Sequence, residues 1–424
     1  MYQQKKIKLE FRLISKYIFA RREALSFIVC SLLIFGGKGI DAQENNADKI
    51  FIGGDIITVD DKNPEARAIA VHNGKIQAIG SETEVLKYEG YNTEVIDLKG
   101  NTLMPGFIDI HTHPILSAKT AETIDVSGFN HKNQAEVMES LKKGIEEKGS
   151  GEWVIAFGWD PAILRNLEAP TLKELDQMAP ENPLFIIAQT LHSGFANSLA
   201  LEEAGINKYS PNPEGGYFDK DENGELTGLI VEVGAMTKIA DATPKYPRAA
   251  YLYLLTKQME TYSKAGYTTI VAPGLQPIIP KHIQSLQEVA EHPNSPVRVF
   301  TYPLFDRLEK THFKPSQGNQ KFKVLGPKFW IDGSPYAGGM AMNEPYLDNE
   351  FTRYKLGIKF GKKGHLTYVD ERLYFLIEKF HKEGWQIAAH IQGERAAKQF
   401  WMQLKRHNRF FPEMIIDTVW SIML

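Results

Sequence analysis

Two histidines at the end of an apolar stretch, at residues 105–113, constrain this chain more than any other feature. The stretch reads as a buried strand, and side chains two residues apart on a strand share a face, so His111 and His113 should point toward one place. Neutral imidazole is a common ligand of zinc-like cations, and the carboxyl end of a strand at a barrel mouth is a common place for such a site. The pattern therefore predicts a metal site. The alternative is one packed histidine and one hydrogen-bonded histidine.

Length and charge set broad limits. At roughly 150 residues per domain, the 424 residues allow two or three domains with a large core. The net charge of −3, without a stripe of basic and aromatic residues, argues against a nucleic-acid partner. Cys30 is the only cysteine and lies outside the predicted mature chain, which excludes disulfides, thiolate metal sites and a cysteine nucleophile there.

Residues 1–43 have the order of a signal peptide or N-terminal anchor. Lysines and arginines come first, an apolar run follows at residues 24–35, and a polar stretch ends at Gln43. The apolar run is shorter than the ~20 residues that span a bilayer. We therefore expect an exported protein, periplasmic or secreted, without a stable membrane partner unless the segment stays uncleaved.

The remaining chain predicts two kinds of structure. Residues 48–104 read as short strands at 50–59, 68–72, 75–79 and 94–98, with a hairpin turn at Asn73-Gly74, and we expect one half of a small β-sandwich. From residue 105 to 409, strands alternate with helices, which predicts an α/β fold with a parallel sheet. Residues 118–243 read as an insertion, and residues 410–424 as an aberrant tail.

Within residues 105–409 the apolar periodicity predicts these elements. The expected helices are 132–148, 171–178, 197–204, 249–265, 281–291, 371–382 and 394–406. The expected strands are 153–157, 184–188, 267–272, 297–302, 328–331 and 386–389, with a hairpin turn at Asn223-Gly224.

Seven segments, in order from about residue 55 to 403, resemble the amidohydrolase superfamily, in particular its amidohydrolase 3 branch with the N-substituted formamide deformylases. Seven segments are more specific than one motif. They are Asn73-Gly74-Lys75-Ile76, residues 104–109 with His111 and His113, Gly158-Trp159-Asp160, His192 with Asn197-Ser198, Ala204-Gly205-Ile206, residues 328–334, and His390 with Gly393.

The resemblance implies a fold and a ligand set. The fold would be a (β/α)8 TIM-type barrel of the metal-dependent hydrolase kind, incomplete here after its fifth strand, with a β-sandwich. His111 and His113 would be ligands on the first strand, Lys328 would carry a CO2-derived carbamate, and His390 would be the fifth-strand ligand. The cofactor would be one or two divalent ions, zinc being the expected metal. A bound divalent cation acidifies water and polarises a carbonyl, which implies hydrolysis of an amide-like bond.

Each candidate residue also has an ordinary structural interpretation. Lys328 could be a surface ammonium, and His390 could be a core histidine. His192 could contact substrate or make a structural hydrogen bond, and Glu232 could face the site or solvent. Trp159 is a weak candidate for substrate binding and fits packing better.

Two parts of the family pattern are not found in the sequence: an Arg-x-Glu-His segment on strand six and a Ser-Asp segment on strand eight. His407 is the only later histidine and reads as part of a solvated helix end. No catalytic residue is therefore assigned, and loss of general acid–base help would cost about 10²–10⁴-fold in rate. We also expect the open edge of such a barrel to favour aggregation or pairing with another chain.

The first functional hypothesis is an exported metal-dependent hydrolase of non-peptide carbon–nitrogen bonds, such as those of N-acyl or N-formyl amines, with impaired activity. Its partner would be a small amide-like substrate, with self-association into a homo-oligomer as a further expectation. The alternatives are a non-catalytic exported protein that binds metal or ligand, and a non-functional fragment.

Overall fold

The computed structural model describes residues 46–213, 216–274, 282–315, 317–410 and 418–421. The predicted leader at residues 1–43 and Cys30 lie outside the described residues. The chain divides into two compact units, Met1–Pro105 and Gly106–Leu424. None of the helices that the structure describes is long and apolar enough to cross a membrane.

The first unit contains two small sheets with strand orders β5-β4-β1-β6 and β3-β2-β7. A short helix, α2 (Glu82–Val85), begins at Ser81 in a capping box and continues as the 3-10 turn η1 (Leu86–Tyr88). Asn73-Gly74 turns the β4–β5 hairpin, as predicted. The strands are β1 (Lys49–Ile52), β2 (Asp55–Ile57), β3 (Glu65–Ala66), β4 (Ala68–His72), β5 (Lys75–Gly80), β6 (Glu94–Asp97) and β7 (Thr102–Leu103).

The single strand predicted at residues 50–59 is wrong, because β1 and β2 belong to different sheets. Gly53 separates them with φ of +73°, a conformation that glycine adopts without steric cost. A Cβ at this position would lie 2.2 Å from Asp97 Oδ1. Glycine is therefore required where the chain leaves one sheet for the other.

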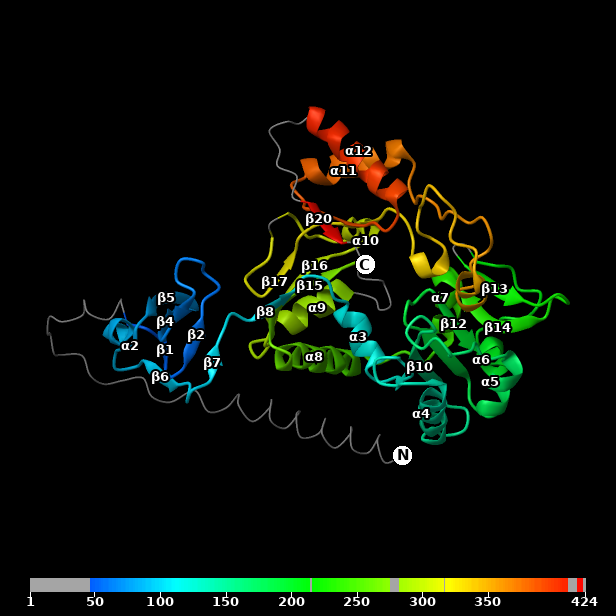
Figure 1. Ribbon diagram of the computed structural model, residues 1–424, viewed down its shortest axis with the longest axis horizontal. Coiled ribbons are helices and arrows are strands. Elements are labelled where there is room, and N and C mark those ends of the chain that lie inside the picture. Colours follow the sequence, from blue (N-terminus) through cyan, green and yellow to red (C-terminus); the bar gives the residue numbers. More distant parts are fainter. Residues whose placement is uncertain (1–45, 214–215, 275–281, 316, 411–417, 422–424) are drawn as a thin grey trace, which may run out of the picture. The chain divides into compact units, whose positions relative to one another are not determined.

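The segment predicted as an insertion forms a six-stranded sheet with the order β13-β14-β12-β11-β10-β9 (green in Figure 1). Three of these strands, β9, β10 and β11, are parallel, and the others are antiparallel. The strands are β9 (Ile124–Asp125), β10 (Val154–Trp159), β11 (Leu184–Ala188), β12 (Ser193–Ala196), β13 (Tyr217–Lys220) and β14 (Leu226–Val231). The helices are α4 (Gln134–Glu146), α5 (Leu172–Met178), α6 (Ser198–Glu203) and α7 (Glu232–Ala242), of which α7 was not predicted.

The rest of the second unit contains two parallel sheets, β17-β16-β15-β8 and β18-β19-β20. An isolated parallel bridge between Leu304 and Lys328 joins the end of β16 to β18. The strands are β8 (Phe107–Asp109), β15 (Tyr267–Pro273), β16 (Arg298–Tyr302), β17 (Phe322–Val324), β18 (Lys328–Trp330), β19 (Ile387–His390) and β20 (Thr418–Ser421). The unit is therefore α/β, with parallel strands in sequence order from β8 to β20.

Helices cover these strands. The helix α8 contacts α3, α9 and β15, whereas α11 contacts β19 and α12 (Figure 1). Their bounds are α3 (Pro114–Thr120), α8 (Arg248–Lys264), α9 (His282–Glu291), α10 (Phe305–Leu308), α11 (Asp370–Lys382) and α12 (Glu394–Phe410), with shorter turns η2 (Pro335–Ala337) and η3 (Phe351–Lys355).

The prediction that a buried strand precedes His111 is wrong. The strand β8 has only three residues, and Phe107 and Ile108 are 50% and 61% exposed. Among the described strands β8 pairs only with β15, so it is an edge strand whose outer side is uncovered.

The segment predicted as an aberrant tail contributes the strand β20. It pairs in parallel with β19 and places Thr418 beside Ile387 and Ser421 beside His390. The sequence did not predict this strand.

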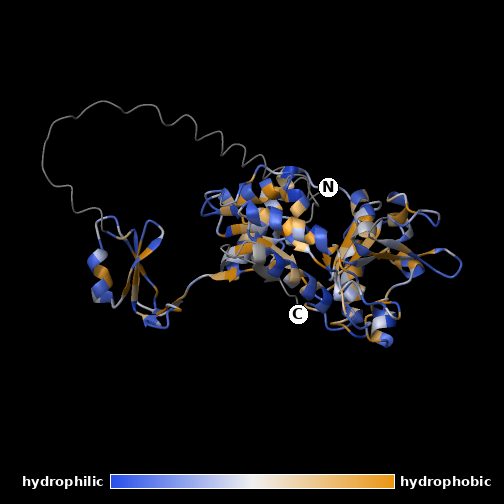
Figure 2. Ribbon diagram, turned by 90° about the horizontal axis from the view of Figure 1, so that it is seen from above, coloured by the Kyte–Doolittle hydropathy of each residue, from blue (hydrophilic) through white to orange (hydrophobic). Residues whose placement is uncertain are grey.

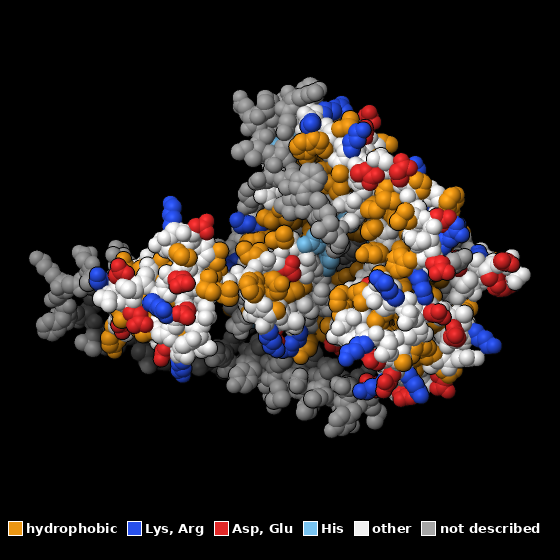
Figure 3. Space-filling model, viewed as in Figure 1, with side chains coloured by type: hydrophobic (Ala, Val, Ile, Leu, Met, Phe, Trp, Pro, Cys, Tyr) orange, Lys and Arg blue, Asp and Glu red, His pale blue; other side chains and the backbone are white. Residues whose placement is uncertain are grey.

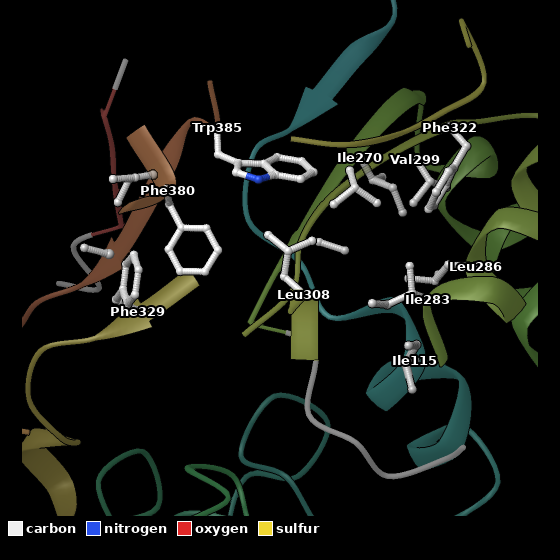
Figure 4. Packing of buried hydrophobic residues seen from close by; sticks show 14 of the residues in the cluster. Ile115, Ile270, Ile283, Leu286, Val299, Leu308, Phe322, Phe329, Phe380 and Trp385 are labelled. Carbon is white, nitrogen blue, oxygen red and sulfur yellow. The ribbon is translucent and has the colours of Figure 1, made fainter. Parts of the chain in front are cut away.

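One apolar core lies beneath both parallel sheets. It joins residues from α3, α8, α9, α11 and α12 to the strands β15–β19, and its members point toward one another in Figure 4. Hydrophobic and hydrophilic residues alternate along the helices in Figure 2, as expected for helices with one buried face. Phe329 is fully buried at the centre of an aromatic group formed with Phe305, Tyr368 and Phe380.

Replacing this ring should weaken the second unit. We expect Phe329→Ala to lower the free energy of unfolding by about 3–5 kcal/mol, because a fully buried ring leaves a cavity. The control Phe375→Ala removes a ring that is 52% exposed on α11 and should change it by less than about 0.5 kcal/mol. Urea unfolding followed by tryptophan fluorescence measures both. Equal effects would contradict the described core.

Candidate metal centre

His111 and His113 meet in the loop that follows β8. His113 precedes the first residue of α3, and the loop between the histidines is held by Thr112. The Thr112 amide donates to the Val271 carbonyl at 3.0 Å, and its hydroxyl lies 2.8 Å from that of Tyr262. The two imidazole centroids are 5.3 Å apart in an edge-to-face arrangement. The rings thus converge as predicted, although the loop and not strand alternation brings them together.

Lys328 begins β18 and is almost completely buried, with 2% of its surface exposed. Its Nζ has no hydrogen-bond partner among the described residues. Burial lowers the pKa of Lys328 to about 7. The interpretation of Lys328 as a surface ammonium is therefore wrong. A neutral amine is a nucleophile that can react with CO2, whereas an ammonium is not.

His390 ends β19, next to Lys328 on β18. The parallel register sets Lys328 beside Ala388 and Trp330 beside His390, so Lys328 and His390 lie on one face of neighbouring strands. The His390 ring also lies 5.5 Å from the Trp330 ring, centroid to centroid. This register explains why two residues far apart in the sequence share one site.

The pKa values of the three histidines are lowered by burial and by the nearby Lys328. Burial, followed by the nearby Lys328, lowers the pKa of His111 and of His390 to about 4, and the same two causes lower the pKa of His113. A pKa near 4 keeps an imidazole neutral at pH 7, and only the neutral ring has a free lone pair for a cation. The site therefore brings three neutral imidazoles near a buried amine.

Asp332 holds the loops that follow β18 and β19. Its buried carboxylate accepts hydrogen bonds from the backbone amides of Ala341, Gln392 and Gly393 at 2.7–2.9 Å. A Cβ at Gly393 would lie 2.1 Å from the Ala341 carbonyl oxygen, so only glycine permits this approach. The sequence pattern assigned no role to Asp332, although its place two residues after β18 was a usable signal.

The three weaker candidates, His192, Glu232 and Trp159, lie in different surroundings. His192 and Glu232 form a pair in the inserted sheet, with Nδ1 2.8 Å from Oε2, and His192 contributes to lowering the pKa of His390. Trp159 is 3% exposed and stacks edge-on against Phe195 within the core of the inserted sheet. Its position agrees with packing and not with substrate binding.

His407 was predicted to be solvated, and this is wrong. Its side chain is fully buried, and its Nε2 lies 2.6 Å from Nδ1 of His381 on α11. The apolar face of α12 turns inward at this position. His407 is thus part of the packing between α11 and α12.

Imidazole nitrogens suit a divalent cation chemically, but the described side chains do not form a finished ligand cage. In the part of the chain that the structure describes, no three His, Cys, Asp or Glu side chains are grouped closely enough to hold an ion. The Lys328 amine, without a hydrogen-bond partner among the described residues, lies near the three histidines. Histidine side chains are visible in the hollow near the centre of the second unit in Figure 3.

A family model described as the amidohydrolase family matches residues 94–413. The chain belongs to the amidohydrolase family. This range includes the loop of His111 and His113, the strands of Lys328 and His390, and the inserted sheet. The family agrees with the resemblance found in the sequence.

The chain matches only part of the length of two curated relatives. N-substituted formamide deformylase of Arthrobacter pascens is 34% identical over 226 residues, which are 53% of this chain and 42% of that protein. The YtcJ protein of Bacillus subtilis is 26% identical over 373 residues, 84% of this chain and 66% of that protein. The chain therefore spans less than two thirds of either relative.

The fold has solved counterparts. An uncharacterized metal-dependent hydrolase from Pyrococcus horikoshii superimposes with a TM-score of 0.62 at 24% identity, covering 84% of this chain and 68% of that one. A second, from Pyrococcus furiosus, gives 0.61 at 24% identity, covering 85% and 70%. At this identity the likeness establishes the α/β fold.

Lys328 should make stability depend on pH. Its pKa falls from 10.5 to about 7 on folding, so the unfolded chain binds the extra proton above pH 7 and the free energy of unfolding rises with pH. In CO2-free buffer, the free energy of unfolding of the wild type should rise between about pH 7 and 9 by roughly 2 kcal/mol more than that of Lys328→Met.

Urea unfolding across this pH range measures the difference. The control Lys359→Met removes an exposed lysine and should leave the pH dependence as in the wild type. If wild type and Lys328→Met gave parallel curves, the buried amine would have to be paired or hydrated.

Proposed function

We propose that this chain is a metal-dependent hydrolase of non-peptide carbon–nitrogen bonds, such as those of N-acyl or N-formyl amines. The observation that carries the proposal is the buried Lys328 amine, without a hydrogen-bond partner in the described chain, beside three neutral imidazoles. An isolated buried amine destabilises a fold, so its position suggests a chemical use. Family membership supports the reaction class.

His111, His113 and His390 would hold one or two divalent cations, with zinc as the expected ion. Neutral imidazole suits zinc, and Lys328 would add an anionic oxygen donor after its neutral amine takes up CO2 as a carbamate. A bound cation would act as a Lewis acid that acidifies water and polarises the amide carbonyl.

The residues of the chain would orient this site. Asp332 fixes the backbone directly after His390 through Gln392 and Gly393, and Thr112 fixes the loop between His111 and His113. Such support holds ligands in place when a cation binds. Loss of the Asp332 carboxylate would therefore loosen the loops after β18 and β19 together.

We infer slow turnover, because no acid–base residue is assigned in this chain. The deformylase relative, by its name, acts on N-substituted formamides, and small N-substituted amides are the substrates we propose here. We further propose that the parallel strands β8 to β20 form part of a (β/α)8 barrel accompanied by a β-sandwich. We also propose that the protein is exported to the periplasm or the medium. We propose further that it self-associates through the open edge at β8.

Removing a histidine ligand should remove the metal. After loading with zinc and bicarbonate and then gel filtration, the wild type should retain zinc, and His111→Ala and His390→Ala should retain less than about a tenth as much, because each loses a nitrogen donor. Elemental analysis measures the metal, and hydrolysis of N-benzylformamide measures activity.

His292→Ala is the matched control, because His292 is exposed and lies outside the site. It should keep the metal and the activity of the wild type. Metal retention without turnover would favour the alternative of a non-catalytic binding protein. A wild type that retains no metal would contradict the proposed site.

A further inference from the structure

The pair His192–Glu232 is held by more restraints than an ordinary surface ion pair. The side chains meet at 2.8 Å, and the Glu232 amide also donates to the His192 carbonyl at 2.6 Å. Leu191, which precedes His192, and Glu232 itself have a left-handed backbone, with φ of +61° and +68°. Non-glycine residues rarely adopt this conformation, and such strain gathers at functional sites.

The pair comes from the inserted sheet, and His192 lies within electrostatic range of His390. Leu191 and His192 lie between β11 and β12, whereas Glu232 directly follows β14. The side chains are 15% and 31% exposed, so they are partly accessible. His192 interacts electrostatically with His390, and Glu232 with Tyr217 on β13. His192 is therefore the member of the pair near His390, and Glu232 is the member near Tyr217 on β13.

The chemistry of the pair determines which nitrogen of His192 carries the proton. An ionised carboxylate only accepts hydrogen bonds, so Nδ1 of the neutral ring must donate to Glu232. The proton then resides on Nδ1, and Nε2 retains a lone pair. A neutral His192 thus offers the site an acceptor and not a donor.

We propose that His192 selects substrates whose amide nitrogen carries a hydrogen, by accepting that N–H at Nε2, with Glu232 as the residue that sets the tautomer. The inference rests on the proposed function, which places the amide carbonyl at the metal centre beside His390. An N-monosubstituted amide donates its N–H to Nε2. An N,N-disubstituted amide has no such hydrogen and leaves Nε2 desolvated without a hydrogen-bond partner. His192 is a specificity-determining residue and Glu232 a positioning residue.

The first test reads the tautomer directly. In ¹⁵N-labelled full-length protein at about pH 8, long-range ¹H–¹⁵N spectra should show His192 protonated at Nδ1 alone. Glu232→Ala should shift the proton toward Nε2, whereas Glu225→Ala, which removes an exposed carboxylate paired with Lys208, should not. Protonation at Nε2 in the wild type, alone or together with Nδ1, would overturn the inference.

The second test measures ligand preference without turnover. N-benzylformamide should bind the wild type about tenfold more tightly than N-benzyl-N-methylformamide, as one hydrogen bond allows. His192→Phe should reduce this ratio to near one, and His131→Ala, a control in the same inserted segment, should preserve it. Ligand-observed NMR titration gives the ratio.

The outcomes separate this inference from the proposed function. A wild type that prefers neither ligand, or binds neither, overturns the inference, and so does a preference that survives His192→Phe. If the preference depends on His192 but the chain retains no metal, the inference stands and the proposed function fails. If the chain retains metal but shows no His192-dependent preference, the inference fails and the proposed function stands.

Discussion

The burial of the Lys328 amine is the constraint on which the candidate site depends. An ammonium in this position would lose its hydration without gaining a partner in the described structure, so the folded chain favours the neutral amine, with a pKa of about 7. The same burial and the same lysine lower the pKa of His111 and His390. Burial of each group, more than any charge between them, thus favours the neutral form of the lysine and of the histidines.

Strand register and backbone hydrogen bonds position the residues of the candidate site. The register between β18 and β19 puts Lys328 and His390 on one face, and the Asp332 carboxylate ties down the backbone after both strands. The loop after β8 brings His111 and His113 together, and the Thr112 amide ties this loop to Val271 on the neighbouring strand β15. The three histidines therefore lie at or after the carboxyl ends of β8 and β19, where α/β folds usually bind ligands, and Lys328 joins them from the first residue of the short strand β18.

Much of this could be predicted from the sequence, because the signals were local. Alternation and apolar periodicity located strands such as β11 and helices such as α5, and seven ordered segments indicated the family. Long-range features could not be predicted. The strand at residues 50–59 is divided at Gly53, β8 is exposed because its partner edge is open, and His407 is buried by packing against α11. Each depends on what lies beside the segment in space.

The central claim is that Lys328 is a reactive neutral amine that contributes to metal binding. It is tested most directly by ¹³C NMR of the full-length protein in ¹³C-bicarbonate with zinc. The account predicts a carbamate carbon signal in the wild type that is missing in Lys328→Met and present in Lys359→Met. No carbamate signal in the wild type, or an equal signal in Lys328→Met, would contradict it.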